Sequence, residues 1–133
     1  MTRHVSARGK KYKWLNYRTG VKDIYFRLDA DSKEARVSIE LQHSDAGIRE
    51  LFYEQFWELQ SMLHNLSPSE WNWEPLYYEL DGREISRIYV SKPGVNIYEQ
   101  GDWGEIFRFF ESYIVPLDEI WSLCEDVFKD LAK

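Results

Sequence analysis

Residues 22–43 read Lys-Asp-Ile-Tyr-Phe-Arg-Leu-Asp-Ala-Asp-Ser-Lys-Glu-Ala-Arg-Val-Ser-Ile-Glu-Leu-Gln-His. Apolar and polar side chains alternate over residues 23–29 and again over 36–42, as they do in strands with one buried face. The polar stretch between them predicts a turn, so the two runs form an antiparallel hairpin. A turn centred near Ser32 and Lys33 would place Asp23 across from Gln42 and Tyr25 across from Glu40, all on one face.

A helix is predicted directly after this hairpin. Apolar residues recur at spacings of three and four from Ile48 to Leu66, and either Ser44 or Asp45 is suited to cap the first turn. Arg49 falls on the polar face of this helix. Tyr53 and Trp57 lie at the flank of the apolar stripe, and we interpret them as the edge of the core rather than as a platform for a ligand.

A second hairpin is indicated by Asp81-Gly82, which separates strand-like runs over residues 71–80 and 83–91. Pro75 within the first run indicates a sheet edge or a bulge there. Residues 95–98 offer one further short strand.

The last predicted element is helical. The stretch 102–105 has the spacing of a capping box, and apolar residues then recur at helical intervals to Leu131, with the helix broken at Pro116. Cys124 lies within the apolar stripe and is interpreted as a small buried side chain rather than a nucleophile.

These elements predict an α+β fold of two layers, in the order ββα-βββ-α. A mainly antiparallel sheet of four to five strands would have its helices on one face. Residues 1–20 form a basic N-terminal arm and residues 21–133 a single domain. The arm has six Lys or Arg and no Asp or Glu, so the remainder carries a formal charge of −12, given −6 for the whole chain.

The acidic body disfavours nucleic-acid binding by the domain unless charges segregate by face. A single cysteine excludes an internal disulfide framework. The sequence has neither a signal-peptide pattern nor a long apolar run, so we expect a soluble cytoplasmic protein without membrane association.

Three polar residues of the first hairpin resemble part of a metal-dependent nuclease site. Restriction-type enzymes use an Asp on one strand and Glu-x-Lys on its neighbour to bind Mg²⁺. Here Asp23, Glu40 and Gln42 are the candidate catalytic residues, and Asp23 and Glu40 the candidate metal ligands. Gln42 replaces the lysine and lacks its charge. The favoured alternative is an exposed sheet face on which Arg27 and Arg36 pair with Glu40 and no metal or cofactor is bound.

The same face carries candidate binding residues, Tyr25, Arg27, Arg87 and Tyr89. Tyr and Arg are enriched at interface hot spots and at base-stacking platforms. Trp71, Trp73, Tyr77 and Tyr78 enlarge this set, and strand alternation requires at least one of the two adjacent tyrosines to point away from the helices.

A resemblance to a known family covers nearly all of the chain. The segments 14–29, 39–43, 48–52, 85–89, 102–103 and 117–121 resemble an uncharacterised bacterial family, the domain of unknown function numbered 4268. The resemblance implies a prokaryotic domain that occurs alone or behind a predicted nuclease-like domain, and it transfers no catalytic residues. We therefore expect a non-enzymatic interaction or accessory module for a protein or nucleic-acid partner. The alternative is a nuclease-like domain or a degenerate relative. Self-association through the C-terminal helix is a further possibility.

Overall fold

The computed structural model describes residues 15–132. Its strands and helices follow the chain as β1 (Leu15–Tyr17), β2 (Ile24–Ala30), β3 (Glu34–Leu41), α1 (Ala46–Glu58), α2 (Gln60–Leu66), β4 (Asn72–Tyr78), β5 (Glu84–Pro93) and α3 (Trp103–Leu131), with a short 3-10 turn at Gln100–Asp102. The strands form one antiparallel sheet in the order β1-β2-β3-β5-β4. The predicted two-layer α+β fold, with a sheet of four to five strands, is confirmed.

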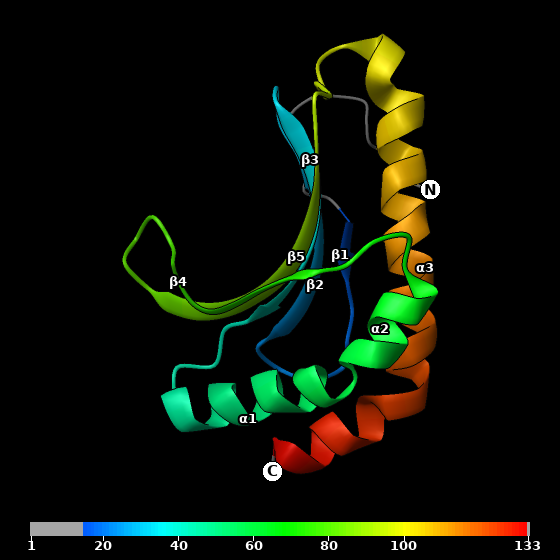
Figure 1. The fold of residues 1–133 in the computed structure, drawn as a ribbon. Coiled ribbons are helices and arrows are strands. Elements are labelled where there is room, and N and C mark those ends of the chain that lie inside the picture. The colour runs from blue at the N-terminus through cyan, green and yellow to red at the C-terminus, as the bar shows by residue number, and fades with distance from the viewer. Residues whose placement is uncertain (1–14, 133) are drawn as a thin grey trace.

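The sheet is strongly curved, and its helices lie against the outer side of the curve (Figure 1). Helix α3 runs along the full height of one side of the molecule, and α1 lies beneath the bent part of the sheet. The hairpin of β4 and β5 bends away from the helices. The face opposite the helices is therefore concave.

The register of the first hairpin agrees with the sequence. Tyr25 is paired with Glu40, and the N–H of Gln42 donates to the carbonyl of Asp23 at 2.8 Å. The carboxylate of Asp31 closes the turn by accepting the N–H groups of Lys33 and Glu34, at 2.8 and 3.0 Å. Asp81-Gly82 turns the second hairpin, and a register shift between Glu74 and Tyr77 forms the bulge expected at Pro75, on edge strand β4.

The core lies between the sheet and the helices. From the sheet it takes the apolar residues of the alternating strands, and from the helices it takes mainly rings. The Phe56 ring centroid lies 4.5 Å from that of Phe128 and 6.2 Å from that of Trp121. All three side chains are buried, as is Cys124. Burying side chains of this size stabilises the fold by about 1.5–3 kcal/mol each.

Several predicted element boundaries were wrong. The first helix divides at Leu59 into α1 and α2. Residues 95–98 are not a strand, and the fifth strand is instead β1, which pairs with β2. Residues 15–17 of the predicted arm thus belong to the sheet, whereas residues 1–14 lie outside the part of the chain described. Asp45, one of the two predicted caps, accepts from the N–H groups of Gly47 and Ile48.

The last helix is continuous through Pro116, so the predicted break was wrong. Proline lacks the N–H that would bond to the carbonyl four residues earlier, which bends a helix without ending it when packing continues on both sides. Tyr113 and Leu117 are both buried, and Figure 1 shows that the later part of α3 changes direction. The predicted capping box is absent, because the carboxylate of Asp102 accepts from the N–H of Asn96 instead. Among the described residues, no helix is long and apolar enough to cross a membrane.

Candidate functional site: the concave polar face

The concave face of the sheet carries polar side chains in register across four strands. One row runs from Tyr25 through Glu40 and Arg87 to Glu74. The next row runs from Arg27 through Ser38 and Tyr89 to Asn72. All four predicted binding residues therefore lie in two adjacent rows, and we call this surface the polar face.

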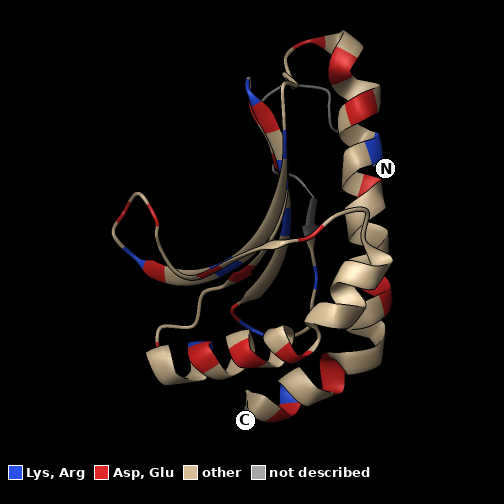
Figure 2. Ribbon diagram, in the orientation of Figure 1, with Lys and Arg blue, Asp and Glu red and all other residues tan. Residues whose placement is uncertain are grey.

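A cavity of about 350 Å³ lies on the polar face. The curl of the β4–β5 hairpin closes one side of it. Its lining residues are Arg27, Asp29, Arg36, Ser38, Glu40, Gln42, Tyr77, Glu79, Leu80, Arg83 and Arg87. The cavity thus combines four arginines with three carboxylates, and Figure 2 shows basic and acidic residues interspersed on these strands.

Arg87 is held in the cavity by contacts with two rings and a carboxylate. Its guanidinium carbon lies 3.8 Å from the ring centroid of Tyr77 and 4.5 Å from that of Tyr89. Its Nε and Nη2 atoms lie 2.8 and 2.7 Å from Oε1 of Glu74. With 12% of its side chain exposed, Arg87 is held by two rings and a carboxylate, and its planar group is fixed in orientation.

The carboxylate of Glu40 is already engaged by neighbouring donors. Its Oε1 atom lies 3.0 Å from Nε of Arg27 and accepts a hydrogen bond of 2.7 Å from the side-chain amide of Gln42. The amide oxygen of Gln42 in turn accepts from Nη1 of Arg83 at 3.0 Å. The Arg27 ε N–H is not aimed along a hydrogen bond, so its attraction to Glu40 is mainly Coulombic.

Asp23 is placed differently from the other two candidate catalytic residues. It lies in the turn before β2 with a φ of +71°, and it is not among the residues that line the cavity. Asp is one of the few residue types that adopt this left-handed conformation readily. Within residues 15–132, no group of three His, Cys, Asp or Glu side chains is arranged to hold a metal ion. The side chains of Glu40 and Gln42 contact each other, whereas Asp23 is joined to Gln42 through a backbone hydrogen bond and does not line the cavity.

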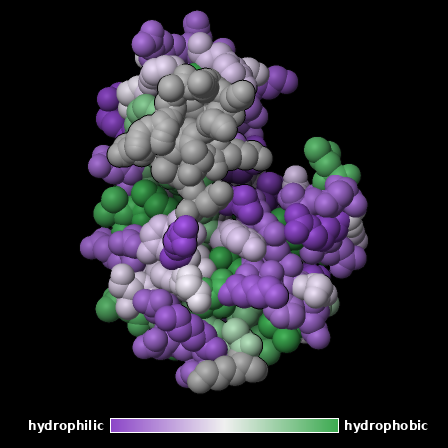
Figure 3. Space-filling model, turned by 180° about the vertical axis from the view of Figure 1, so that it is seen from behind, coloured by the Kyte–Doolittle hydropathy of each residue, from purple (hydrophilic) through white to green (hydrophobic). Residues whose placement is uncertain are grey.

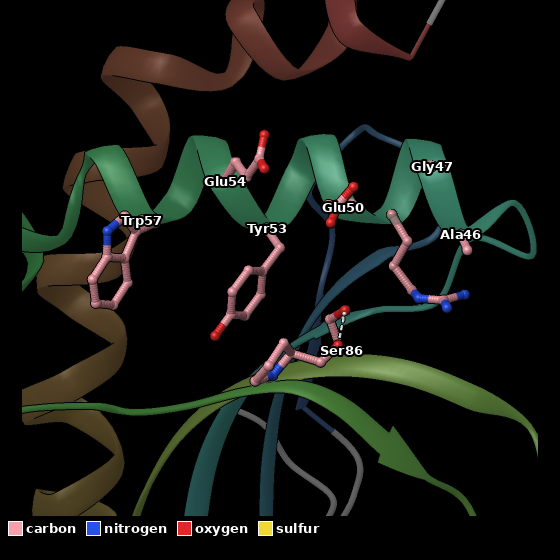
Figure 4. A pocket seen from close by; sticks show the side chains of 9 residues that line it. Ala46, Gly47, Glu50, Tyr53, Glu54, Trp57 and Ser86 are labelled. Atoms are coloured by element: carbon pink, nitrogen blue, oxygen red, sulfur yellow. Dashed lines mark hydrogen bonds between the residues drawn. The ribbon is translucent and has the colours of Figure 1, made fainter.

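A second hollow lies on the helix side of the sheet, between α1 and the β4–β5 hairpin; we call it the α1 groove. Its volume is about 600 Å³. Figure 4 shows Tyr53 and Trp57 extending from α1 toward the hairpin that carries Ser86. Trp73 packs edge-on against both rings, with centroid distances of 5.8 Å to Tyr53 and 5.0 Å to Trp57.

Arg49 also lines the α1 groove, contrary to the prediction that it is solvated. Only 6% of it is exposed, and its Nη1 donates to the carbonyl of His43 at 2.8 Å. Its Nη2 lies 3.4 Å from the carboxylate of Glu84 on β5. Helical periodicity alone could not show this, because β5 lies 35 residues further along the chain.

The aromatic residues of the second hairpin divide between the two sides of the sheet. Trp71 is buried against Tyr113, and Trp73 faces α1. Tyr77 stacks on Arg87 at the polar face. Strand alternation predicted that at least one of the adjacent Tyr77 and Tyr78 would point away from the helices. Sequence reasoning did not assign Arg83 to the site, because the bulge and the hairpin curl that bring it there are tertiary features.

The model of a family described as "Domain of unknown function (DUF4268)" matches residues 1–124. No curated protein and no solved structure matches the chain.

Proposed function

The chain belongs to the DUF4268 family, and we propose that it is a non-enzymatic module that binds another protein on the polar face. The observation that carries the proposal is the stack of Tyr77, Arg87 and Tyr89 within a concave cavity. Tyrosine and arginine are the residue types that most often carry binding energy in protein interfaces. Because Arg87 is already fixed, it would lose little side-chain entropy when a partner binds.

The charge distribution favours a protein over a nucleic acid. Helices α1 and α3 together contain ten Asp or Glu and three Lys or Arg, a net charge of −7. The cavity has four arginines against Asp29, Glu40 and Glu79, a net charge of only +1. Figure 2 shows the acidic residues along the helices. Phosphates would meet a nearly neutral face on an acidic protein, whereas a protein surface of mixed charge could pair with both signs.

The hairpin tip beside the cavity supplies an apolar contact. Leu80 lines the cavity and is fully exposed. Figure 3 shows the projecting hairpin from behind, largely hydrophilic with a hydrophobic tip. An exposed leucine next to an arginine–tyrosine cavity is the combination of apolar anchor and polar surroundings found in interfaces.

A metal-dependent nuclease remains the weaker alternative. Arg27 and Gln42 already engage Oε1 of Glu40 and would compete with Mg²⁺ for that carboxylate. Gln42 also lacks the charge that would stabilise a developing anion. The left-handed backbone of Asp23, which Asp adopts more readily than most residues, also favours a structural role for that residue in the turn.

Site-specific photo-crosslinking in the native cells tests the proposal. A photoreactive phenylalanine analogue replaces Leu80, and the matched control carries it at Leu123, which is 79% exposed on α3. We expect position 80 alone to crosslink a discrete polypeptide, and we expect Arg87→Ala to abolish that product. Crosslinking to nucleic acid, or equal products from both positions, would contradict the proposal. So would Mg²⁺-dependent DNA cleavage by the purified protein that Glu40→Ala abolishes.

A further inference from the structure

Arg83 differs from the other arginines of the polar-face cavity, because it has no carboxylate partner among residues 15–132. The other three are ion-paired at 3.0, 2.7 and 2.7 Å, as Arg27–Glu40, Arg36–Glu34 and Arg87–Glu74. Nη1 of Arg83 instead donates to the neutral amide oxygen of Gln42 at 3.0 Å. The charge of Arg83 is therefore not compensated by a direct ion pair in this part of the chain.

Hydrogen bonds on both sides restrict the position of Arg83. The side-chain amide nitrogen of Gln42 donates to Oε1 of Glu40 at 2.7 Å, which leaves the amide oxygen to accept from Arg83. The backbone N–H of Arg83 donates to the carboxylate of Asp81 in the hairpin turn at 3.0 Å. A partner would thus meet a side chain that is already anchored, and binding would cost less side-chain entropy.

The guanidinium of Arg83 keeps most of its donors available. An arginine carries five N–H groups in a planar fork that matches a carboxylate. The bond to Gln42 uses one of them, and no other residue of the described part of the chain accepts from the rest. Arg83 is exposed, and it lines the cavity together with Leu80, which is fully exposed three residues earlier. The apolar contact and the free donors therefore lie on the same hairpin tip.

We propose that Arg83 binds an Asp or Glu side chain of the partner protein, next to the contact made by Leu80. This inference rests on the proposed function, since it names a chemical group of the protein that binds the polar face. An ionised acceptor makes a shorter and stronger hydrogen bond to a guanidinium than a neutral one does, which favours a carboxylate.

Glu79 is the group that opposes such a carboxylate. It lines the same cavity and has no ion pair within residues 15–132. A partner cation could pair with Glu79, but the four arginines of the cavity would repel it. The two possible charges of the partner residue thus predict opposite effects of removing the charge of Glu79.

Photo-crosslinking from position 80 of the full chain measures this contact. Every variant carries the photoreactive phenylalanine analogue in place of Leu80, and the yield of the crosslinked polypeptide is compared below saturation. We expect Arg83→Gln to lower the yield about three- to tenfold, and Glu79→Gln not to lower it. The matched control is Arg108→Gln, which makes the same change of charge at an exposed position of α3 and should leave the yield unchanged.

Charge reversal tests the partner's side of the contact. Mass spectrometry of the product should place an Asp or Glu near the attachment site, and replacing that residue by Lys should restore the product in Arg83→Glu. A crosslinked segment without a carboxylate, or a yield that Arg83→Gln leaves unchanged or that Arg108→Gln lowers equally, would overturn this inference and leave the proposed function standing. A lower yield in Glu79→Gln would indicate a partner cation and would overturn it too. Absence of any product from position 80 would overturn both.

Discussion

The indole N–H of Trp121 donates a buried hydrogen bond of 2.9 Å to the carbonyl of Thr19, 102 residues earlier in the chain. This bond joins α3 to the loop between β1 and β2. The hydroxyl of Thr19 also donates to the carbonyl of Ile24 at 2.8 Å. The loop that positions β2, and through it Arg27 on the polar face, is thus held by the C-terminal helix.

Replacing Trp121 by Phe should lower the free energy of unfolding by about 2–4 kcal/mol. The change leaves the buried Thr19 carbonyl without a donor and removes part of a packed ring. Urea denaturation measures the effect. Trp57→Phe is the control, because that indole is half exposed and should cost less than about 1 kcal/mol. Equal unfolding midpoints for the two variants would show that the bond to Thr19 does not anchor the loop.

Replacing Arg49 by Met should destabilise the protein by about 1–3 kcal/mol, because the carbonyl of His43 loses its donor in a partly buried site. Glu84→Gln should cost less than about 0.5 kcal/mol, since the carboxylate is half exposed. Urea denaturation of both variants separates the hydrogen bond from the ion pair. A loss in Glu84→Gln as large as that in Arg49→Met would mean that the ion pair holds α1 to β5.

The first hairpin could be predicted because the residues that determine its strands and its turn are close together in the sequence. The alternation of Ile24, Phe26 and Leu28 with polar residues fixes which face is buried, and a two-residue period allows one register once the turn is placed. The same argument placed Tyr25, Arg27, Arg87 and Tyr89 on one face. Their role in binding stays a prediction.

Other features depend on contacts that no local pattern contains. Strand β1 is only three residues long, and it is a strand because β2 offers it a free edge. Arg49 occupies a polar position of its helix, yet it is buried because Glu84 and the hairpin cover it. The α1 groove likewise arises from the curl of the hairpin past α1. Periodicity indicated that Tyr53 and Trp57 lie at the flank of the stripe but could not show what they face.

The stability of the protein should fall at high pH through Tyr17. Burial, followed by the hydrogen bond from its hydroxyl to Asp118, raises the pKa of Tyr17 from about 10 to about 12. Because the folded state holds the proton more tightly than the unfolded state does, this stabilisation is fully present below pH 10. It is lost as the pH rises from about 10 to about 12.

Urea midpoints between pH 8 and pH 12 test this dependence. Tyr17→Phe should be less stable than the wild type at pH 8 and should show a shallower decline above pH 10. Tyr78→Phe, at an exposed position on β4, is the control and should follow the wild type. Parallel curves for Tyr17→Phe and the wild type would contradict the assignment to Tyr17.

The role of Asp23 in the turn can be tested with two substitutions: glycine, which its backbone conformation tolerates, and valine, which it does not. With φ at +71°, Asp23→Gly should stay within about 1 kcal/mol of the wild-type stability, because relief of strain offsets the added freedom of the unfolded chain. Asp23→Val should lose about 1–2 kcal/mol, since a β-branched residue is strained in this conformation. Urea denaturation gives both values.

Mn²⁺ binding followed by NMR tests whether Asp23 only stabilises the turn or also ligates a metal. If Asp23 only stabilises the turn, adding Mn²⁺ should broaden the amide NMR signals near Glu40 to the same extent in the wild type and in Asp23→Asn. If Asp23 and Glu40 share a metal, the wild type should show strong local broadening that Asp23→Asn removes at unchanged stability. That second result would favour the nuclease-like alternative, because the carboxylate would then contribute chemistry that the left-handed turn does not require.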